Sequence, residues 1–503
     1  MRPHHLPLLV LLLGADDPWA DASTQDLHGY ARAVSLDLRG VVPSTDELAA
    51  IEAAGTLDDT TLDAWLHSEE FVQVVVEKHR ERFWNVLELT LLNSRRITRR
   101  SNIHFVSSRA RTLRGLSQTH CGDFEADVDE HNRPLSWQDN ADGSISEGYV
   151  WVAPYWDPDN PVQVCALDAQ TALVSDSGTD CSTEDGHSDD GCGCGPSLQW
   201  CFDSREEDRI EAAIATDLDL RVRAMLESNA PYSTLFTGDN IYMDGASAHF
   251  YRHLVHFRTD DYDSPVPVSS IPDIDYASEN FVAVPLPDYH AGVLTAPGWL
   301  LRHQTNRGRA NRFYGGFLCS EFLPATGGES SLDAAELPTP DLQARTGCLD
   351  CHARLEPWSA YWGRWTQAGS RYLAEDTHPS FSIECAECEG SGARCSDTCD
   401  DHYITVAGHP DEEPFIGTFQ PYAFLYDDKA EHPDLGPLAW VDKARADGSL
   451  AQCAVTQATD WLLHEDARTH DLEAWSAEFA ADEDYRSLVR QVVTSTSYWG
   501  GAE

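Results

Sequence analysis

The segment "LDAWLHSEEFVQVVVEKHRERFWNVLELTLLN", residues 62–93, gives the clearest indication of fold class. Large apolar side chains recur in it at spacings of three and four, which is the period of an α-helix. Upstream, Ser44 follows Pro43 and precedes Glu47 by three residues, a capping-box pattern that marks a helix start. These signals predict an N-terminal helical domain over residues 23–115.

Two further parts of the chain share this helical character. The segment "EDRIEAAIATDLDLRVRAMLES", residues 207–228, contains good helix formers and neither glycine nor proline. It belongs to a predicted helical domain over 205–320. A last run of helical pattern predicts a C-terminal helical domain over 437–503, and no internal repeat of fixed period is present.

Two acidic, cysteine-containing insertions interrupt these helices, at residues 116–204 and 379–436. In the first, "DSGTDCSTEDGHSDDGCGCG" (176–195) contains too few apolar side chains to form a packed core, so loops held by disulfides are expected. The expected fold is therefore mainly α: multi-helical domains around a central segment, 321–378, with two loop-rich, acidic, disulfide-containing insertions.

The N-terminus has the pattern of a secretory signal peptide, predicted over residues 1–22. The apolar run Leu6–Gly14 follows Arg2 and precedes the small-residue pattern Ala20-Asp21-Ala22. This run is too short to span a bilayer as a helix, and no later segment qualifies, so an integral membrane protein is not expected. The expected location is the periplasm or the cell surface.

The 14 cysteines fit an oxidising compartment. Cys348 and Cys351 form a closely spaced pair with a different expected role. Without them twelve cysteines remain, an even number that suits disulfide bonds, although their connectivity cannot be read from the sequence.

The net charge of −49, with only three lysines, is strongly acidic. Such a surface repels phosphate backbones, so a nucleic-acid partner is excluded from the expected functions. Solubility explains the charge most simply, and a basic protein partner is the functional alternative.

Calcium binding is a weaker expectation, resting on "QDNADGSISEGY" (138–149). Asn140, Asp142, Gly143 and Ile145 fall at suitable positions of a calcium loop, but Tyr149 stands where the bidentate glutamate belongs.

The central motif is "GCLDCHARLEPW", residues 347–358. Cys348 and Cys351, followed at once by His352, have the spacing for covalent attachment of a c-type haem. Two thiols on one helical turn form thioethers to the haem, and the next imidazole serves as the proximal iron ligand. The segment 321–378 is therefore predicted to bind haem c.

Three other interpretations of the cysteine pair stay open. Zinc could be held by Cys348, Cys351, Cys385 and Cys388, although the gap between the two pairs is long for such a site. A thioredoxin-like redox pair would need a βαβ context, which the sequence does not indicate here. A plain structural disulfide is the third interpretation.

The stretch "GCLDCHARLEPWSAYWGRW" resembles the haem segment of the planctomycete-type cytochrome c family, in which an Asp-Pro or Glu-Pro turn and aromatic residues follow the motif. Other segments resemble the family in the same order: "RAVSLDLRGVVPSTDEL" (32–48), "NAPYSTLFTGDNIYMDGASAHFYR" (229–252), "HAGVLTAPGWLLRHQTNRGRANRFYGGFLC" (290–319) and "DYRSLVRQVVTSTSYW" (484–499). The resemblance covers roughly half of the chain and leaves out both insertions. It implies an exported, multi-domain protein with haem c on Cys348, Cys351 and His352.

The second axial ligand of the iron is not evident. No methionine follows the motif, so Met243, His249 and His253 are the candidate distal ligands, with Met225, His378, His402 and His409 as alternatives. His249, His253 and His256 share one helical face in "HFYRHLVHF". A basic cluster, formed by Arg302, Arg307, Arg309 and Arg312, fits either haem propionates or internal ion pairs.

The expected function is that of an exported c-type cytochrome with one covalent haem, transferring electrons to or from a redox partner protein. An electron carrier is favoured over an enzyme. The alternatives are a haem-dependent oxidoreductase acting on an extracellular substrate, and a disulfide-stapled surface interaction protein without haem. Motifs of nucleotide-binding loops, serine hydrolases and zinc proteases are absent from the sequence.

Overall fold

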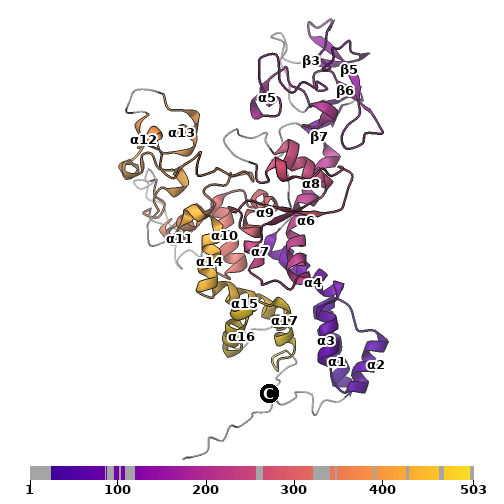
Figure 1. Ribbon diagram of the computed structural model, residues 1–503, viewed down its shortest axis with the longest axis vertical. Coiled ribbons are helices and arrows are strands. Elements are labelled where there is room, and N and C mark those ends of the chain that lie inside the picture. Colours follow the sequence, from indigo (N-terminus) through magenta and orange to yellow (C-terminus); the bar gives the residue numbers. More distant parts are fainter. Residues whose placement is uncertain are drawn as a thin grey trace, which may run out of the picture. The chain divides into compact units, whose positions relative to one another are not determined.

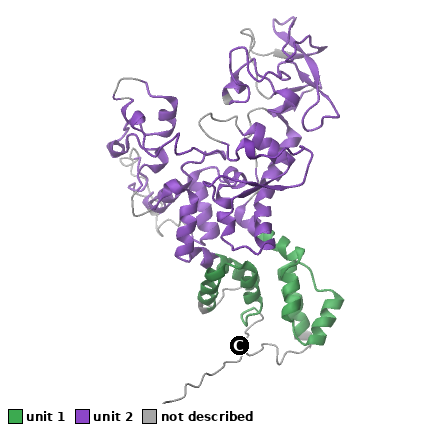
Figure 2. Cartoon of the chain, in the orientation of Figure 1, with its two compact units in different colours: residues 1–78, 454–503 green, residues 79–453 purple. Residues whose placement is uncertain are grey.

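The computed structural model describes residues 24–84, 87, 96–100, 103–107, 119–255, 264–320, 340–345, 348–388, 390, 394–425, 430–463 and 469–498. The predicted signal peptide, 1–22, lies outside the described residues. The chain divides into two compact units: Met1–Lys78 with Ala454–Glu503, and His79–Cys453 (Figure 2).

The first unit is helical, as the sequence predicts. Its N-terminal part holds α1 (Thr24–Arg39), α2 (Thr45–Ala54), α3 (Asp59–Leu66) and most of α4 (Glu69–Phe83) (Figure 1). The predicted capping box at the start of α2 is confirmed: Glu47 N–H donates to the Ser44 hydroxyl over 3.2 Å, and Ser44 N–H donates to the Glu47 carboxylate over 2.7 Å.

The same unit contains the last helices of the chain, α16 (Thr469–Asp482), α17 (Tyr485–Val493) and most of α15 (Ser449–Leu463). Buried polar contacts join the two ends of the sequence. The Tyr30 hydroxyl donates to the Val493 carbonyl over 2.8 Å, and Arg486 donates to the Leu66 carbonyl over 2.9 Å. The N- and C-terminal helices therefore complete one another's core.

The second unit contains a mixed sheet that the sequence analysis missed. Seven strands pair in the order β3-β5-β6-β2-β1-β7, with β4 on β5. They are β1 (Arg96–Arg99), β2 (Phe105–Ser107), β3 (Thr119–Glu125), β4 (Gln138–Asp139), β5 (Ile145–Val152), β6 (Val162–Cys165) and β7 (Phe202–Asp203). The loop-rich interpretation of 116–204 was therefore wrong where β3 to β7 form, whereas residues 176–195 contain turns and the short helix α5 (Glu184–Ser188), held by the Cys181–Cys192 disulfide as expected. The predicted helical domain 23–115 also includes two strands.

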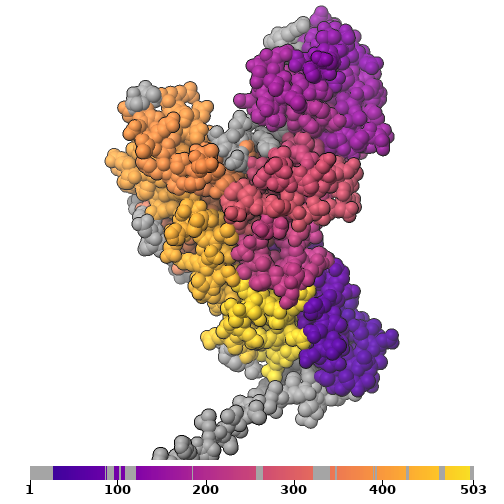
Figure 3. Space-filling model, in the orientation of Figure 1, coloured from indigo at the N-terminus to yellow at the C-terminus, as the bar shows by residue number. Residues whose placement is uncertain are grey.

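The sheet is stable despite its acidic composition because it buries one apolar cluster. Its strands contribute Ile97, Phe105, Val150, Val152 and Val164, packed with the Cys194–Cys201 disulfide. A second disulfide, Cys121–Cys165, joins β3 to β6. Figure 3 shows one face of this part of the chain in purple.

Helices from the middle of the chain form the rest of the second unit's core. Their bounds are α6 (Ser204–Glu227), α7 (Thr234–Thr237), α8 (Gly245–His249), α9 (Pro297–Arg302), α10 (Asn306–Phe317), α11 (Leu349–Ser359) and α14 (Pro437–Ala446). A short hairpin-like pair, β8 (Asn240–Met243) with β9 (Val282–Pro285), packs beside α6. Helix was the prediction for most of these residues, and it is confirmed.

The second insertion matches its prediction. It consists of loops with two short helices, α12 (Ile383–Glu387) and α13 (Asp397–His402), and several single turns. Two disulfides, Cys385–Cys399 and Cys388–Cys395, hold these helices together.

The cysteine arithmetic is confirmed. Six disulfides account for twelve cysteines, and the two cysteines outside them are Cys348 and Cys351. The remaining bridges are Cys181–Cys192 and Cys319–Cys453. So many disulfides are typical of proteins from oxidising compartments.

Two buried histidines predict a pH dependence of stability. Burial lowers the pKa of His290 and of His303 to about 3, while their ring nitrogens donate to the carbonyls of Pro265 and Phe83 over 2.8 and 3.2 Å. The unfolded chain binds these protons near pH 6.5, so stability is full above that pH and falls as the pH drops towards 3. We expect each histidine to lower the free energy of unfolding by about 1.4 kcal/mol for each pH unit below about pH 6.

Chemical denaturation at pH 7 and pH 5 would measure this effect, since most carboxylates stay ionised in that window. The variant His290→Gln cannot take up the proton, so it should lose less stability between the two pH values than the parent chain. An equal loss in both proteins would contradict the assignment.

Candidate functional site

The predicted haem motif lies at the start of α11. Cys348 occupies the N-cap position of this helix, and the His352 N–H donates to the Cys348 carbonyl over 3.0 Å. Cys348 and Cys351 are therefore separated by about one helical turn and share a face. Both cysteines and His352 are partly exposed, so the thiols and the imidazole are accessible from outside the core.

A carboxylate fixes the orientation of the His352 ring. Nδ1 of His352 donates to Glu356 Oε1, one helical turn further along α11. An ionised carboxylate can only accept, so a neutral imidazole in this contact has its proton on Nδ1 and the lone pair of Nε2 points away from Glu356. This tautomer is the one that a metal-binding histidine adopts when a second residue holds its other nitrogen.

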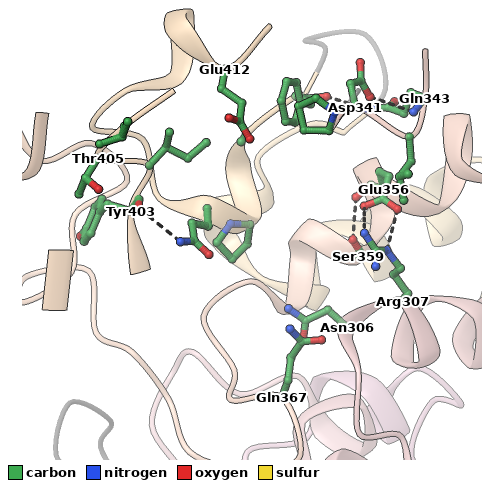
Figure 4. A pocket seen from close by; sticks show the side chains of 18 of the residues that line it. Asn306, Arg307, Asp341, Gln343, Glu356, Ser359, Gln367, Tyr403, Thr405 and Glu412 are labelled. Atoms are coloured by element: carbon green, nitrogen blue, oxygen red, sulfur yellow. Dashed lines mark hydrogen bonds and ion pairs between the residues drawn. The ribbon is translucent and has the colours of Figure 1, made fainter. Parts of the chain in front are cut away.

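Arg307, on α10, holds the same carboxylate from the other side. Its Nε donates to Glu356 Oε1 over 2.7 Å and its second guanidinium nitrogen donates to Oε2 over 3.1 Å. The bidentate arrangement restricts the carboxylate plane more than a single hydrogen bond would. Figure 4 shows Arg307 meeting Glu356 between the two helices.

The position of α10 is itself set by a buried arginine. Arg309 is fully buried, and its guanidinium donates to the carbonyls of His303, Thr366 and Gly369 over 2.8, 2.7 and 3.0 Å. These contacts tie the start of α10 to the chain that follows α11. Aromatic packing adds to this, with the Tyr314 and Trp358 ring centroids 4.5 Å apart.

The basic cluster predicted around Arg309 is held by internal contacts. Arg307 pairs with Glu356, while Arg302 donates to the Trp84 carbonyl over 3.0 Å and Arg312 to the Arg82 carbonyl over 2.6 Å. Of the two interpretations offered by the sequence, internal pairing describes these contacts. Backbone carbonyls are the main acceptors.

The predicted distal ligands lie elsewhere in the second unit. Met243 is fully buried at the end of β8. His249 ends α8, where Nε2 lies 3.1 Å from the Gln199 carbonyl and the ring stacks on Tyr155 at 3.6 Å. Burial lowers the pKa of His249 well below its usual value. His253 is partly exposed one turn later, with its ring 4.8 Å from that of His249.

Met243, His249 and His253 therefore each contact other parts of the second unit. Their role as distal iron ligands stays a prediction. His256 lies outside the described residues.

The zinc interpretation is wrong. Cys385 and Cys388, which would complete a four-cysteine site, are bonded to Cys399 and Cys395. Their sulfurs cannot act as thiolate ligands in that state. In the part of the chain that the structure describes, no group of three or more His, Cys, Asp or Glu side chains is placed to hold a metal ion.

The proposed calcium loop is a tight β-turn between β4 and β5. Gly143 N–H donates to the Asn140 carbonyl over 3.0 Å, and the Asp142 carboxylate accepts from the Ser144 N–H over 3.0 Å. Gly143 adopts a φ of +85°, which the turn requires and which glycine allows. The Asp142 carboxylate thus bonds within the turn, and the structure adds no support for calcium binding.

A cavity of about 610 Å³ opens beside α11 (Figure 4). Its wall is mainly polar and includes Glu356 and Ser359 from α11, Arg307 from α10, and Tyr403 and Glu412 from the second insertion. Its volume is within the range of small-molecule sites. Arg307 and Glu356 thus belong both to this wall and to the contact that orients His352.

The contact of Glu356 with His352 was not predicted from the sequence. The spacing of four residues between His352 and Glu356 within a helix would have indicated their contact. From the sequence, Glu356-Pro357 was interpreted as part of a turn, whereas Pro357 lies inside α11.

No family model, curated protein or solved structure matches this chain. Within the described ranges, the structure has no helix that combines the length and apolar character needed to cross a membrane.

Proposed function

We propose that this protein is an exported c-type cytochrome that binds one haem through Cys348 and Cys351, with His352 as the proximal ligand. It transfers electrons at the periplasm or the cell surface. The observation that carries the proposal is the separation of the cysteines into two classes. Twelve are committed to disulfides, while the pair before His352 lies outside them on the partly exposed first turn of α11.

The residues present fit such a group. The thiols are spaced for two thioether bonds, and Nε2 of His352 is available because Nδ1 is held by Glu356. A bound haem supplies one-electron redox chemistry. The chain supplies the attachment, the proximal imidazole and, through Glu356 and Arg307, its orientation.

The direct test is expression of the full chain together with cytochrome-maturation machinery, followed by denaturation. A pyridine haemochrome spectrum typical of two thioether bonds, retained by the denatured chain, is the expected result. A folded, exported protein that releases its colour on denaturation would overturn the proposal.

The Glu356 contact predicts shifts of opposite sign in the midpoint potential. A carboxylate that accepts the Nδ1 proton makes the imidazole a stronger donor and stabilises oxidised iron. Glu356→Gln should therefore raise the midpoint potential. For this one-electron couple, a tenfold increase in the ratio of reduced to oxidised protein at a fixed solution potential corresponds to a shift of about 59 mV. Arg307→Gln removes the cation that withdraws charge from this carboxylate, so it should lower the potential.

Redox titration of the two variants would measure both shifts. Arg354→Gln is the matched control, because this exposed arginine of α11 has the same charge but does not bond to Glu356. Shifts of one sign in both variants, or equal shifts for Arg307→Gln and Arg354→Gln, would contradict the proposed role of Glu356.

The acidic surface predicts a salt-sensitive redox partner. With a net charge of −49, association with a basic electron donor or acceptor should be steered electrostatically. We expect the second-order rate of electron transfer with a basic partner to fall steeply as ionic strength rises, as measured by stopped flow. A rate that is independent of salt would remove this part of the proposal.

The cavity beside α11 favours a second candidate function, a haem-dependent oxidoreductase acting on a small polar molecule. The cavity shares Glu356 with the contact that orients His352, which would place a bound molecule within one helical turn of the motif. A high-spin, five-coordinate ferric spectrum would favour this function. A low-spin spectrum typical of two axial ligands would favour the electron carrier.

A further inference from the structure

A second cavity, of about 600 Å³, lies in the second unit and shares no lining residue with the one beside α11. Its wall comes from the disulfide-held part of the first insertion, the turn after α8, and two later segments of the chain. The lining residues used below are Leu173, Val174, Trp200, Arg252, Val268 and Arg371.

Part of the wall of this cavity is apolar. Leu173, Val174 and Val268 expose 59%, 54% and 44% of their surface, so all three are exposed large hydrophobic residues. They converge on one cavity although Val268 is more than ninety positions from the other two, and the indole of Trp200 adds to the wall. Exposed apolar side chains that gather in a concave site are typical of a binding site.

The wall of this cavity also contains charged groups, most of them positive. Two guanidinium groups, those of Arg252 and Arg371, contribute to the lining, against a single carboxylate, that of Asp180. That carboxylate accepts from the Ser182 N–H and hydroxyl over 2.9 and 2.7 Å. With two guanidinium groups and one carboxylate in its lining, the cavity has an excess of one positive charge and favours an anion.

The guanidinium of Arg252 is held in place by the backbone. It donates to the carbonyls of Ile271 and Pro272 over 3.1 and 2.9 Å, and Asp273 lies 3.9 Å away on the exposed side. Arg371 is 6% exposed, so its charge is held within the wall. Fixed guanidinium groups bind carboxylates well because little side-chain entropy is lost on binding.

We propose that this cavity binds an organic monocarboxylate with an aliphatic or aromatic body. Its carboxylate pairs with Arg252 and Arg371, and its apolar part covers Leu173, Val174 and Val268. This site is independent of the haem proposal and holds whether or not the protein carries haem.

The test is calorimetric titration of the full-length chain with octanoate, below its micelle concentration. Acetate lacks the apolar body and octylammonium lacks the negative charge, so both should bind at least about tenfold more weakly. Val268→Asp places a negative charge in the apolar wall and should weaken octanoate binding by about tenfold or more. Val268 is the better site for substitution, because Arg252 also holds two backbone carbonyls.

Leu435→Asp is the matched control, because Leu435 is 60% exposed and does not line the cavity. Octanoate binding that survives in this control and is lost in Val268→Asp would support the site. Absence of octanoate binding, equal binding of octylammonium, or equal loss in both variants would overturn it.

Discussion

Replacing both Cys348 and Cys351 with serine should leave a folded chain that carries no covalently bound haem. Neither cysteine belongs to a disulfide, and both are partly exposed at the start of α11, so the substitution removes little packing. Haem staining of the denatured protein, combined with circular dichroism of the native one, would measure both parts of the prediction.

The matched control is Cys388→Ser with Cys395→Ser. It also removes two cysteines, seven positions apart, but these form a disulfide in the second insertion. The control should lose stability and keep its haem, whereas the motif variant should keep its fold and lose its haem. A control that also fails to bind haem would mean that the insertion's fold, rather than the motif thiols, limits attachment.

The largest effect on stability is expected from the Cys319–Cys453 disulfide, which closes a loop of 134 positions. In the chain-entropy model, a bridge across a loop of this length stabilises the fold by about 5 kcal/mol, because it restricts the unfolded chain. Replacing both residues with serine should lower the free energy of unfolding by about that amount.

Denaturant titration of the variant and the parent chain would measure this difference. The seven-position bridge, Cys388–Cys395, is the comparison, since the same model predicts about half the effect for it. Equal losses for the two bridges would show that local packing, rather than loop length, determines their contribution.

Much of the helical architecture could be predicted from the sequence. Three features depend only on residues close together in the sequence, so local patterns predict them. They are the capping box at Ser44, the apolar periodicity of residues 62–83 and the long uninterrupted helix after Ser204. The separation of the cysteines into twelve and two also needed only counting and the recognition of one motif.

The mixed sheet could not be predicted in the same way. Its strands are two to eight residues long, too short for a clear alternation of apolar and polar residues. Their pairing is distant in sequence: Arg96 on β1 lies opposite Phe202 on β7. Disulfides such as Cys121–Cys165 complete the arrangement, and their connectivity is absent from the sequence pattern.

The candidate site shows the same division. The contact between His352 and Glu356 follows from helical spacing, but Arg307 reaches Glu356 from another helix, 49 positions earlier. Only the tertiary fold, with Arg309 fixing the start of α10, brings this guanidinium to the carboxylate.

The shared core of the terminal helices has a consequence for the order of folding. The contact between Tyr30 and Val493 joins residues 463 positions apart, so the first unit cannot complete its core until the end of the chain is available. Closing so long a loop carries a large entropic cost and slows folding. Prior collapse of His79–Cys453 would shorten the effective loop, so this segment should acquire hydrogen-exchange protection before the helices at the two ends.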